Sequence, residues 1–214
     1  MNSPQDLDLE GATAPRPAGR PRDPDVERSI LTATQDLLIE SGFPGTTIAA
    51  VAARARCGKS AIYRRWETKT ELVVAAVLHL QTPMELPDTG DLRGDLLAAA
   101  MHFGGSDSRS GAVLASVLGE LGKDAELRAA AYRSIGGPPV AALVAVIERW
   151  IGRGVVPPDV PVDLIANIVP TAAFGSVTLR RRSLEPETVA QLVDLVLLPA
   201  LRTTNAAARD ETGS

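Results

Sequence analysis

The hydrophobic residues of the chain recur at intervals of three and four positions, and we find no pair of alternating strands joined by a hairpin turn. This is the spacing of helices that bury one face. Between Thr47 and Arg54, the residues Ile48, Val51 and Ala52 follow it, which predicts a short helix. The hydroxyl of Thr47 is placed to cap the first free amides of that helix.

A second short helix is expected from Lys59 to about Trp66, after a turn in which Gly58 permits backbone angles that other residues avoid. Ile62 and Trp66 are four positions apart, so they face the first helix together. The other side of the second helix carries hydroxyls and cations: Lys59, Ser60, Tyr63 and Arg64. The two helices and their turn have the pattern of a helix-turn-helix.

A helix with small residues at its start can enter the major groove of DNA, because Ser60 and Ala61 let its N-terminal end approach the base edges without collision. The same periodicity also fits an ordinary helical hairpin whose polar face contacts only water. Periodicity leaves both interpretations open.

A longer set of residues, from about position 24 to position 80, resembles the DNA-binding domain of the tetracycline-repressor (TetR) family. The matching residues are Ser41-Gly42-Phe43, Thr46-Thr47-Ile48, Val51-Ala52, Ala55, Lys59-Ser60-Ala61-Ile62-Tyr63, Trp66 and Lys69. Glu148-Arg149-Trp150, Arg153-Gly154 and Pro157-Pro158-Asp159-Val160 also look like the C-terminal domain of one subgroup. There are two departures: Arg56 stands where the family usually has a turn glycine, and Gly58 stands where it usually has a Ser or Thr cap.

The resemblance implies an all-α protein, with an N-terminal three-helix helix-turn-helix DNA-binding domain joined to a helical ligand-binding and dimerisation domain. It implies a repressor that binds a near-palindromic DNA operator as a homodimer and is released by a small-molecule effector. In that role Thr47, Lys59, Tyr63 and Lys69 contact phosphates, and Ser60, Ala61 and Arg64 lie nearest the base edges. Arg56, which departs from the family pattern, is expected to add a phosphate contact. Two alternatives remain: a transcriptional activator, and a helical small-molecule-binding protein with a vestigial helix-turn-helix.

Charge is distributed unevenly along the chain. The net charge is -4, yet residues 15–70 hold ten basic against six acidic side chains. A basic module on an acidic body is typical of a protein that presents one end to phosphate. Residues 1–22 lack periodicity and are expected to form a disordered basic arm, whose arginines either follow a minor groove or are solvated.

The clearest interior boundary is the stretch 82–90, which contains two prolines and a glycine. We therefore expect a helix-turn-helix domain over 23–82 and a helical ligand-binding and dimerisation domain over 83–205. Residues 206–214 are expected to form a disordered tail.

Ten helices are predicted from periodicity, caps and breakers. Asp23 and Pro24 are expected to begin the first, and Gly42 to end it. The ranges are 24–41, 47–54, 59–66, 68–81, 91–103, 110–121, 124–135, 138–152, 161–182 and 186–203. Two glycine pairs, 104–105 and 136–137, are expected to break helices, and Pro170 and Pro199 to bend the helices that contain them.

The last two predicted helices are rich in Leu, Val and Ile, and in the resembled family this pair forms a four-helix bundle with its copy in a second subunit. A dimer also has a physical advantage, since two recognition helices about 34 Å apart can read two adjacent major grooves. We therefore predict a homodimer.

An effector pocket is expected between the helices of residues 91–182, where a few polar or aromatic residues interrupt apolar segments. The candidates are Met101, His102, Phe103, Glu120, Tyr132, Trp150, Asn167, Thr171, Phe174 and Thr178. For each of them ordinary packing or a surface position is an alternative. Asn167, Thr171 and Thr178 fit a pocket wall or hydrogen bonds across a dimer seam.

Other chemistry finds little support in the sequence. The single cysteine, Cys57, excludes an intramolecular disulfide, and in the turn it is explained either by packing or by a redox switch. We find no phosphate loop, nucleophile elbow or paired-histidine metal motif, so we expect no enzyme, cofactor or metal. No signal core or uninterrupted apolar run of about twenty residues is present, which favours a cytoplasmic protein without a membrane partner.

Overall fold

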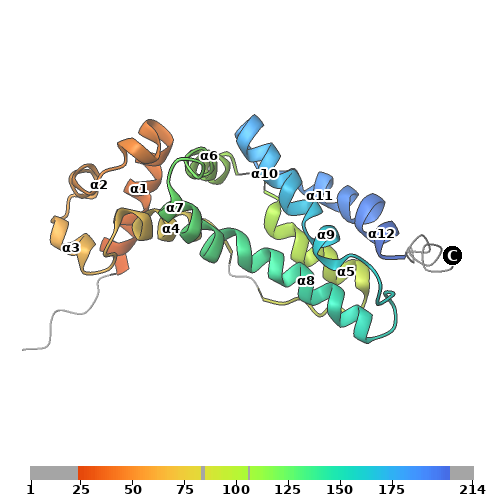
Figure 1. The fold of residues 1–214 in the computed structure, drawn as a ribbon. Helices are drawn as coiled ribbons and strands as arrows, with labels where there is room; N and C mark the ends of the chain where they lie inside the picture. Colours follow the sequence, from red (N-terminus) through yellow and green to blue (C-terminus); the bar gives the residue numbers. More distant parts are fainter. Residues whose placement is uncertain (1–23, 83–84, 106, 203–214) are drawn as a thin grey trace, which may run out of the picture.

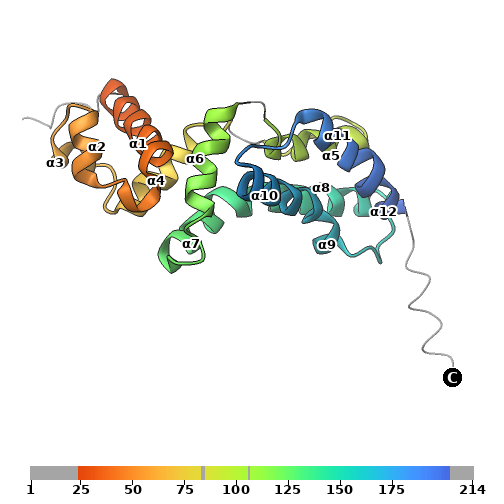
Figure 2. The same ribbon diagram turned by 90° about the horizontal axis from the view of Figure 1, so that it is seen from above.

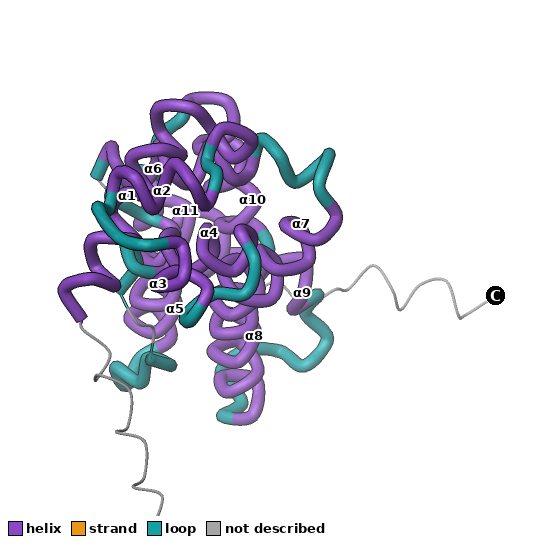
Figure 3. The backbone as a smooth tube through the Cα atoms, turned by 90° about the vertical axis from the view of Figure 1, so that its left-hand side faces the viewer, coloured by secondary structure: helices purple, strands orange, loops and turns teal. Residues whose placement is uncertain are grey.

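The computed structural model describes residues 24–82, 85–105 and 107–202, and every regular element in these ranges is a helix (Figures 1 and 3). The one β-type contact in them is an isolated bridge between Gly104 and Leu184. The expected basic arm, the Asp23 cap and the tail from residue 206 lie outside the described ranges. The predicted all-α fold is confirmed.

Four helices form one end of the molecule, called here the head: α1 (Pro24–Gly45), α2 (Ile48–Arg54), α3 (Lys59–Tyr63) and α4 (Lys69–Leu78). Their apolar faces meet in one cluster. As predicted, Ile62 and Trp66 pack with Val51, and the cluster also contains Ile30 and Leu72. The short helices α2 and α3 are therefore held by tertiary packing, because helices of five to seven residues are not stable alone.

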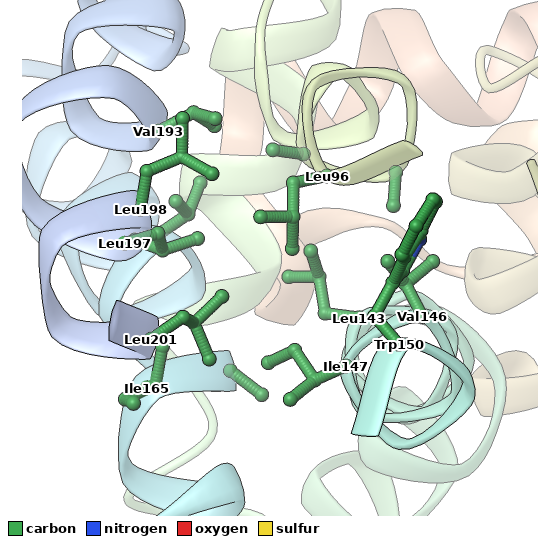
Figure 4. Packing of buried hydrophobic residues seen from close by; sticks show 14 of the residues in the cluster. Leu96, Leu143, Val146, Ile147, Trp150, Ile165, Val193, Leu197, Leu198 and Leu201 are labelled. Atoms are coloured by element: carbon green, nitrogen blue, oxygen red, sulfur yellow. The ribbon is translucent and has the colours of Figure 1, made fainter. Parts of the chain in front are cut away.

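The remaining elements form the body. They are α5 (Leu92–Ala100), the 3-10 turn η1 (Met101–Phe103), α6 (Ser108–Leu118), α7 (Ala125–Ala131), the π-helical turn η2 (Tyr132–Gly136), α8 (Gly137–Gly152), α9 (Val162–Ala166), α10 (Ile168–Arg180), α11 (Pro186–Leu192), the π-helical turn η3 (Val193–Leu197) and α12 (Leu198–Arg202). Figure 4 shows the main core of the body, where Leu143 and Ile147 of α8 point toward Leu96, Leu197 and Leu201.

Head and body share a third apolar cluster, which α4 and α6 build where they lie between the two ends (Figure 2). Leu38 of α1, Val73 of α4, Val117 of α6 and Leu127 of α7 are all fully buried in it. Burying one such side chain stabilises the fold by about 1.5–3 kcal/mol. A movement of α6 or α7 therefore changes the packing of α4.

Several predicted helix limits are wrong for a common reason, the missing amide of proline. Gly136 and Gly137 do not break a helix. Instead, the Gly137 amide donates to the Tyr132 carbonyl in a π-helical turn, which precedes Pro138 and Pro139 in the first turn of α8. A second π-helical turn precedes Pro199, and the helix expected over 161–182 is divided at Asn167, three residues before Pro170.

Two helical stretches of the described chain, Ala125–Gly152 and Val162–Arg180, are long and apolar enough to cross a membrane by length and composition alone. Both contribute buried side chains to the core, such as Leu143 and Val169. Core helices pass the same test, so these two stretches are weak evidence for a membrane protein.

Candidate functional site

The entry to α2 is built by two threonines with different tasks. Gly42 has a φ of 66°, which only glycine adopts freely, and it interrupts the helical path of α1. The buried hydroxyl of Thr46 donates to the Gly42 carbonyl at 2.8 Å. The exposed Thr47 accepts from the Ala50 amide at 3.1 Å, so the predicted cap is confirmed. These bonds fix the direction in which α2 leaves α1.

The turn between α2 and α3 differs from the prediction, because Arg56 and not Gly58 takes the left-handed conformation. Arg56 has a φ of 52°, whereas Gly58 is extended, with a φ of -76°. The Cys57 amide donates to the Ala52 carbonyl at 3.0 Å and the Arg56 amide to the Ala53 carbonyl at 3.3 Å, a Schellman ending. An arginine in this conformation costs on the order of 1 kcal/mol. Gly58 begins α3 without a side-chain cap.

The outer side of α3 is polar and positively charged, as predicted. Lys59, Ser60, Tyr63 and Arg64 are exposed, and Tyr63 has 53% of its surface accessible. No ion-pair partner lies near Arg56, Lys59 or Arg64 within the described chain. By contrast, Arg54 makes two bonds of 2.6 and 2.7 Å to Glu40. The exposed cations of the head that have no ion-pair partner in the described chain therefore lie on α3 and directly before and after it.

Ala61 lies differently from the prediction that it approaches the base edges. It is 8% exposed and belongs to the inner side of α3, next to the fully buried Ile62. The Ala61 carbonyl also accepts a bond of 3.1 Å from Arg65, whose Nε lies 3.4 Å from Glu27 of α1. The helical register places 61 and 62 on the inner side and 59, 60, 63 and 64 on the outer side.

Lys69 has a contact that the sequence did not predict. Its ammonium donates to the Phe43 carbonyl at 2.9 Å and lies 3.8 Å from the centre of the Phe43 ring. Burial lowers the pKa of this ammonium. Lys69 thus ties the first turn of α4 to the end of α1, and its contact with a DNA phosphate stays a prediction.

A cavity of about 970 Å³, partly open to solvent, lies between α4, η1, α6, the turn at the start of α8 and α10. Six of the predicted pocket residues line it: Met101, His102, Phe103, Tyr132, Thr171 and Phe174. Sequence reasoning missed its apolar walls, including Val77 of α4, Val117 of α6 and Val177 of α10. Nothing in the sequence distinguishes these valines from other core residues.

Four predicted pocket residues do not line the cavity. Trp150 is buried in the core, where its indole donates to Asp95 at 2.7 Å. Asn167 is exposed and donates to the Asp163 carbonyl, and Thr178 is also exposed. Glu120 forms a 3.3 Å ion pair with Lys123. Thr171 is exposed as well, so the three residues share an outer face, and of the three only Thr171 borders the cavity.

His102 is the unusual polar residue of the cavity. Its Nε2 atom is buried and has no hydrogen-bond partner in the described chain. Burial lowers the pKa of the imidazole, so the neutral form is favoured. The ring packs edge-on against Phe103 with 5.8 Å between the ring centres. A buried polar atom without a partner is destabilising unless a ligand or water bonds it.

A buried carboxylate joins the loop of residues 85–90 to the body. Asp95 is fully buried and accepts two bonds from Thr89, at 2.6 and 2.8 Å. Its other oxygen accepts from Arg149 and Trp150, both at 2.7 Å, and Arg149 also donates to the Pro87 carbonyl. Burial raises the pKa of Asp95, but these hydrogen bonds outweigh it and hold the pKa below its ordinary value.

A second polar cluster connects head and body. Gln35 of α1 is 2% exposed and donates to the Ala76 carbonyl of α4 at 2.9 Å. The guanidinium of Arg109, on α6, donates to the Gln35 oxygen at 3.1 Å and to Asp36 at 2.7 Å. One arginine on α6 therefore contacts α1 directly and α4 through Gln35.

The redox switch raised for Cys57 finds no support. Burial raises the pKa of the Cys57 thiol, which disfavours the reactive thiolate that a redox switch needs. Within the described residues, no group of three or more His, Cys, Asp or Glu side chains could hold a metal ion.

Comparison with known proteins gives the family. The model of bacterial regulatory proteins of the tetR family matches residues 30–76, and that of a tetracyclin repressor-like C-terminal domain matches residues 86–196. The HTH-type transcriptional regulator Rv1556 of Mycobacterium tuberculosis is 30% identical over 189 residues, which is 86% of this chain and 94% of the relative. The DNA-binding transcriptional repressor TetR of Mycobacteroides abscessus is 30% identical over 177 residues, 81% of this chain and 93% of the relative.

Solved structures agree with these matches. The TetR family transcription regulator SCO0332 is 25% identical, with a TM-score of 0.57 over 81% of this chain and 97% of that one. NalD of Pseudomonas aeruginosa, a repressor of a multidrug efflux pump, is 18% identical and shares the fold, with a TM-score of 0.64 over 84% of this chain and 97% of that one. With both halves matched by family models and relatives matched over nearly their full length, the chain belongs to the TetR family of helix-turn-helix, DNA-binding transcriptional regulators.

Proposed function

We propose that the protein is a homodimeric repressor, acting in the cytoplasm, that binds a near-palindromic operator and releases it when a small molecule occupies the body. The observation that carries the DNA-binding part is the cluster of cations around α3 that have no partners within the described chain. A cation held in an ion pair attracts phosphate less strongly, because its charge is partly neutralised. Arg56, Lys59 and Arg64 have no such partner in the described chain and can therefore bind phosphates.

Within this proposal, Thr47, Arg56, Lys59 and Tyr63 contact phosphates, and Ser60 and Arg64 lie closest to the base edges. Ala61 is left out because it is buried. The ammonium of Lys69 uses one of its three N–H donors on the Phe43 carbonyl, so the donors that remain would have to make a phosphate contact. Removing a phosphate cation should weaken binding to all sequences alike and reduce the salt slope by about one.

The dimer is supported by large apolar side chains that remain exposed on the last helices. They are Leu164 on α9, Phe174 and Leu179 on α10, and Leu195 and Val196 on η3. Leu179 is 84% exposed and Leu195 73% exposed. Their concentration on the helices that pair across the dimer in the family supports an interface there.

Sedimentation tests the dimer. Leu164→Glu with Leu195→Glu should give monomers at micromolar concentration, and Val155→Glu, at another exposed apolar position between α8 and α9, should leave the dimer intact. A wild-type monomer, or a dimer unaffected by the double change, would contradict the proposed interface.

Release requires that the effector bind one conformation of the protein more tightly than the conformation that fits the operator. Val77 of α4 and Val117 of α6 line the cavity, and both belong to the cluster shared by head and body. We propose that an effector displaces α4 against α6, and that the two α3 helices of the dimer then no longer match the spacing of the half-sites.

The experiment that tests the DNA-binding proposal is selection of bound sequences from a random double-stranded DNA pool, followed by titration of the enriched operator at several salt concentrations. Lys59→Ala should weaken binding and lower the salt slope, whereas Lys123→Ala, on the body, should do neither. A folded dimer that enriches no sequence would favour a ligand-binding protein with a vestigial helix-turn-helix. A reporter gene that rises on operator binding would favour an activator.

A further inference from the structure

The inner walls of the body cavity are apolar. The side chains come from α4, α6, η2 and α10, and they include Val77, Leu114, Ile135 and Val177. A cavity of about 970 Å³ is of the size that takes a drug-sized molecule. Such walls favour a ligand that leaves water because most of its surface is hydrocarbon.

The charged groups among the described lining residues all lie at exposed positions. Arg128 is exposed and donates to the Leu121 carbonyl at 2.8 Å. Asp107 is exposed and caps α6 through bonds from the Arg109 and Ser110 amides. Glu85, on the loop before α5, is exposed as well. A charged ligand moved past these groups would meet no buried counter-charge, which is unfavourable.

The interior does offer one polar atom in need of a partner, Nε2 of His102. His102 lines this cavity and also a neighbouring one of about 510 Å³, so it lies where the two meet. A neutral imidazole presents Nε2 as a donor or as an acceptor, depending on its tautomer. One ligand group that hydrogen-bonds there would satisfy it.

We propose that the effector is an uncharged, mostly hydrocarbon molecule with one hydrogen-bond donor, and that this group donates to Nε2 of a neutral His102 whose proton is on Nδ1. The inference rests on the proposed effector-controlled function and names the chemical class that the site takes. An anionic effector is disfavoured, because Arg128 is exposed and no buried cation lies among the described lining residues.

A matched pair of fluorescent probes tests the charge requirement on the full-length protein. N-phenyl-1-naphthylamine and 8-anilinonaphthalene-1-sulfonate share their aromatic part, and only the second carries a sulfonate. The uncharged probe should bind one per chain, at least tenfold more tightly than the sulfonate. Leu114→Trp, which fills the cavity, should abolish this binding, and Ile39→Trp, on the exposed side of α1, should not. Equal or tighter binding of the sulfonate would overturn the proposed class.

The role of His102 is tested by competition between N-phenyl-1-naphthylamine and 1-benzylnaphthalene, which has a CH₂ group in place of the N–H. Wild-type protein should prefer the amine by about tenfold, the value of one net hydrogen bond. His102→Phe should remove the preference while still binding both probes. A preference that survives the substitution, or is absent from the wild type, would refute the anchor.

Operator binding, measured in parallel, separates the two proposals. A protein that binds operator DNA but neither probe leaves the DNA-binding regulator standing and refutes the ligand class. If the protein binds the uncharged probe but enriches no DNA, the inferred ligand class stands and the proposed operator-binding repressor is refuted.

Discussion

Replacing Asp95 by asparagine should destabilise the protein strongly, although the two side chains have almost the same shape. Asp95 is fully buried, and its two oxygens accept four hydrogen bonds, two from Thr89, one from Arg149 and one from Trp150. An amide has only one acceptor oxygen. An NH₂ turned toward Arg149 and Trp150 would leave both without an acceptor, and one turned toward Thr89 would leave the Thr89 amide without an acceptor, although the Thr89 hydroxyl can rotate to accept.

The magnitude follows from the groups left without an acceptor. Each buried donor that loses its partner costs about 1–3 kcal/mol, and breaking a buried ion pair costs about 3–5 kcal/mol. Arg149 loses its buried counter-charge in either orientation, so we expect Asp95→Asn to lower the free energy of unfolding by about 4 kcal/mol. For a chain of this length that corresponds to a fall in Tm of roughly 10 °C.

Thermal unfolding followed by circular dichroism at pH 7 measures this fall. Limited proteolysis should also show faster cleavage within residues 85–90 of the variant, because the bonds from Thr89 to the Asp95 carboxylate are lost. Asp88→Asn is the matched control, because the Asp88 carboxylate makes only an exposed 3.3 Å pair with Arg153. The control should change the unfolding free energy by less than about 0.5 kcal/mol. A Tm of Asp95→Asn within about 2 °C of the wild type would refute the proposed role of this carboxylate.

Three further predictions follow from the contacts of the described residues. The pKa of Asp95 is lower in the folded protein than in the unfolded chain, where it is about 3.9. The ionised carboxylate should therefore stabilise the fold fully above that pH, and this stabilisation should be lost as the pH falls through the folded pKa. The melting temperatures of wild type and Asp95→Asn, measured as a function of pH, should accordingly converge in acid. Arg56→Gly should stabilise the protein by about 0.5–1 kcal/mol in chemical denaturation while weakening operator binding, and a loss of stability would contradict the assignment of backbone strain. Arg109→Met should leave operator affinity nearly unchanged but reduce the effector-induced loss of affinity at least threefold, because Arg109 contacts Gln35 and Asp36 of the head. Anisotropy titration of operator DNA with and without effector measures both quantities. An unchanged effector response would show that these contacts do not transmit the effector signal.

The sequence by itself determined the elements of the head. The hydroxyls of Thr47 and Thr68 cap α2 and α4 by bonding amides three residues ahead, and the spacing of Ile62 and Trp66 sets the buried side of α3. Caps and helical faces depend on residues within one or two turns, so a single sequence contains the information. The same local logic placed the cations of α3 on the outer side, although it misplaced Ala61.

Only the tertiary structure determined which distant residues of the body meet and which residues line its cavity. Asp95 meets Arg149 and Trp150 across 54 and 55 positions of the chain, and Arg109 meets Gln35 across 74. The walls of the cavity come from α4, α6 and α10. The sequence pattern around its valines does not differ from that around valines that fill the core. Whether such a residue lines a cavity or closes a core depends on how far apart two helices cross, and that distance is set by the packing of all their neighbours together.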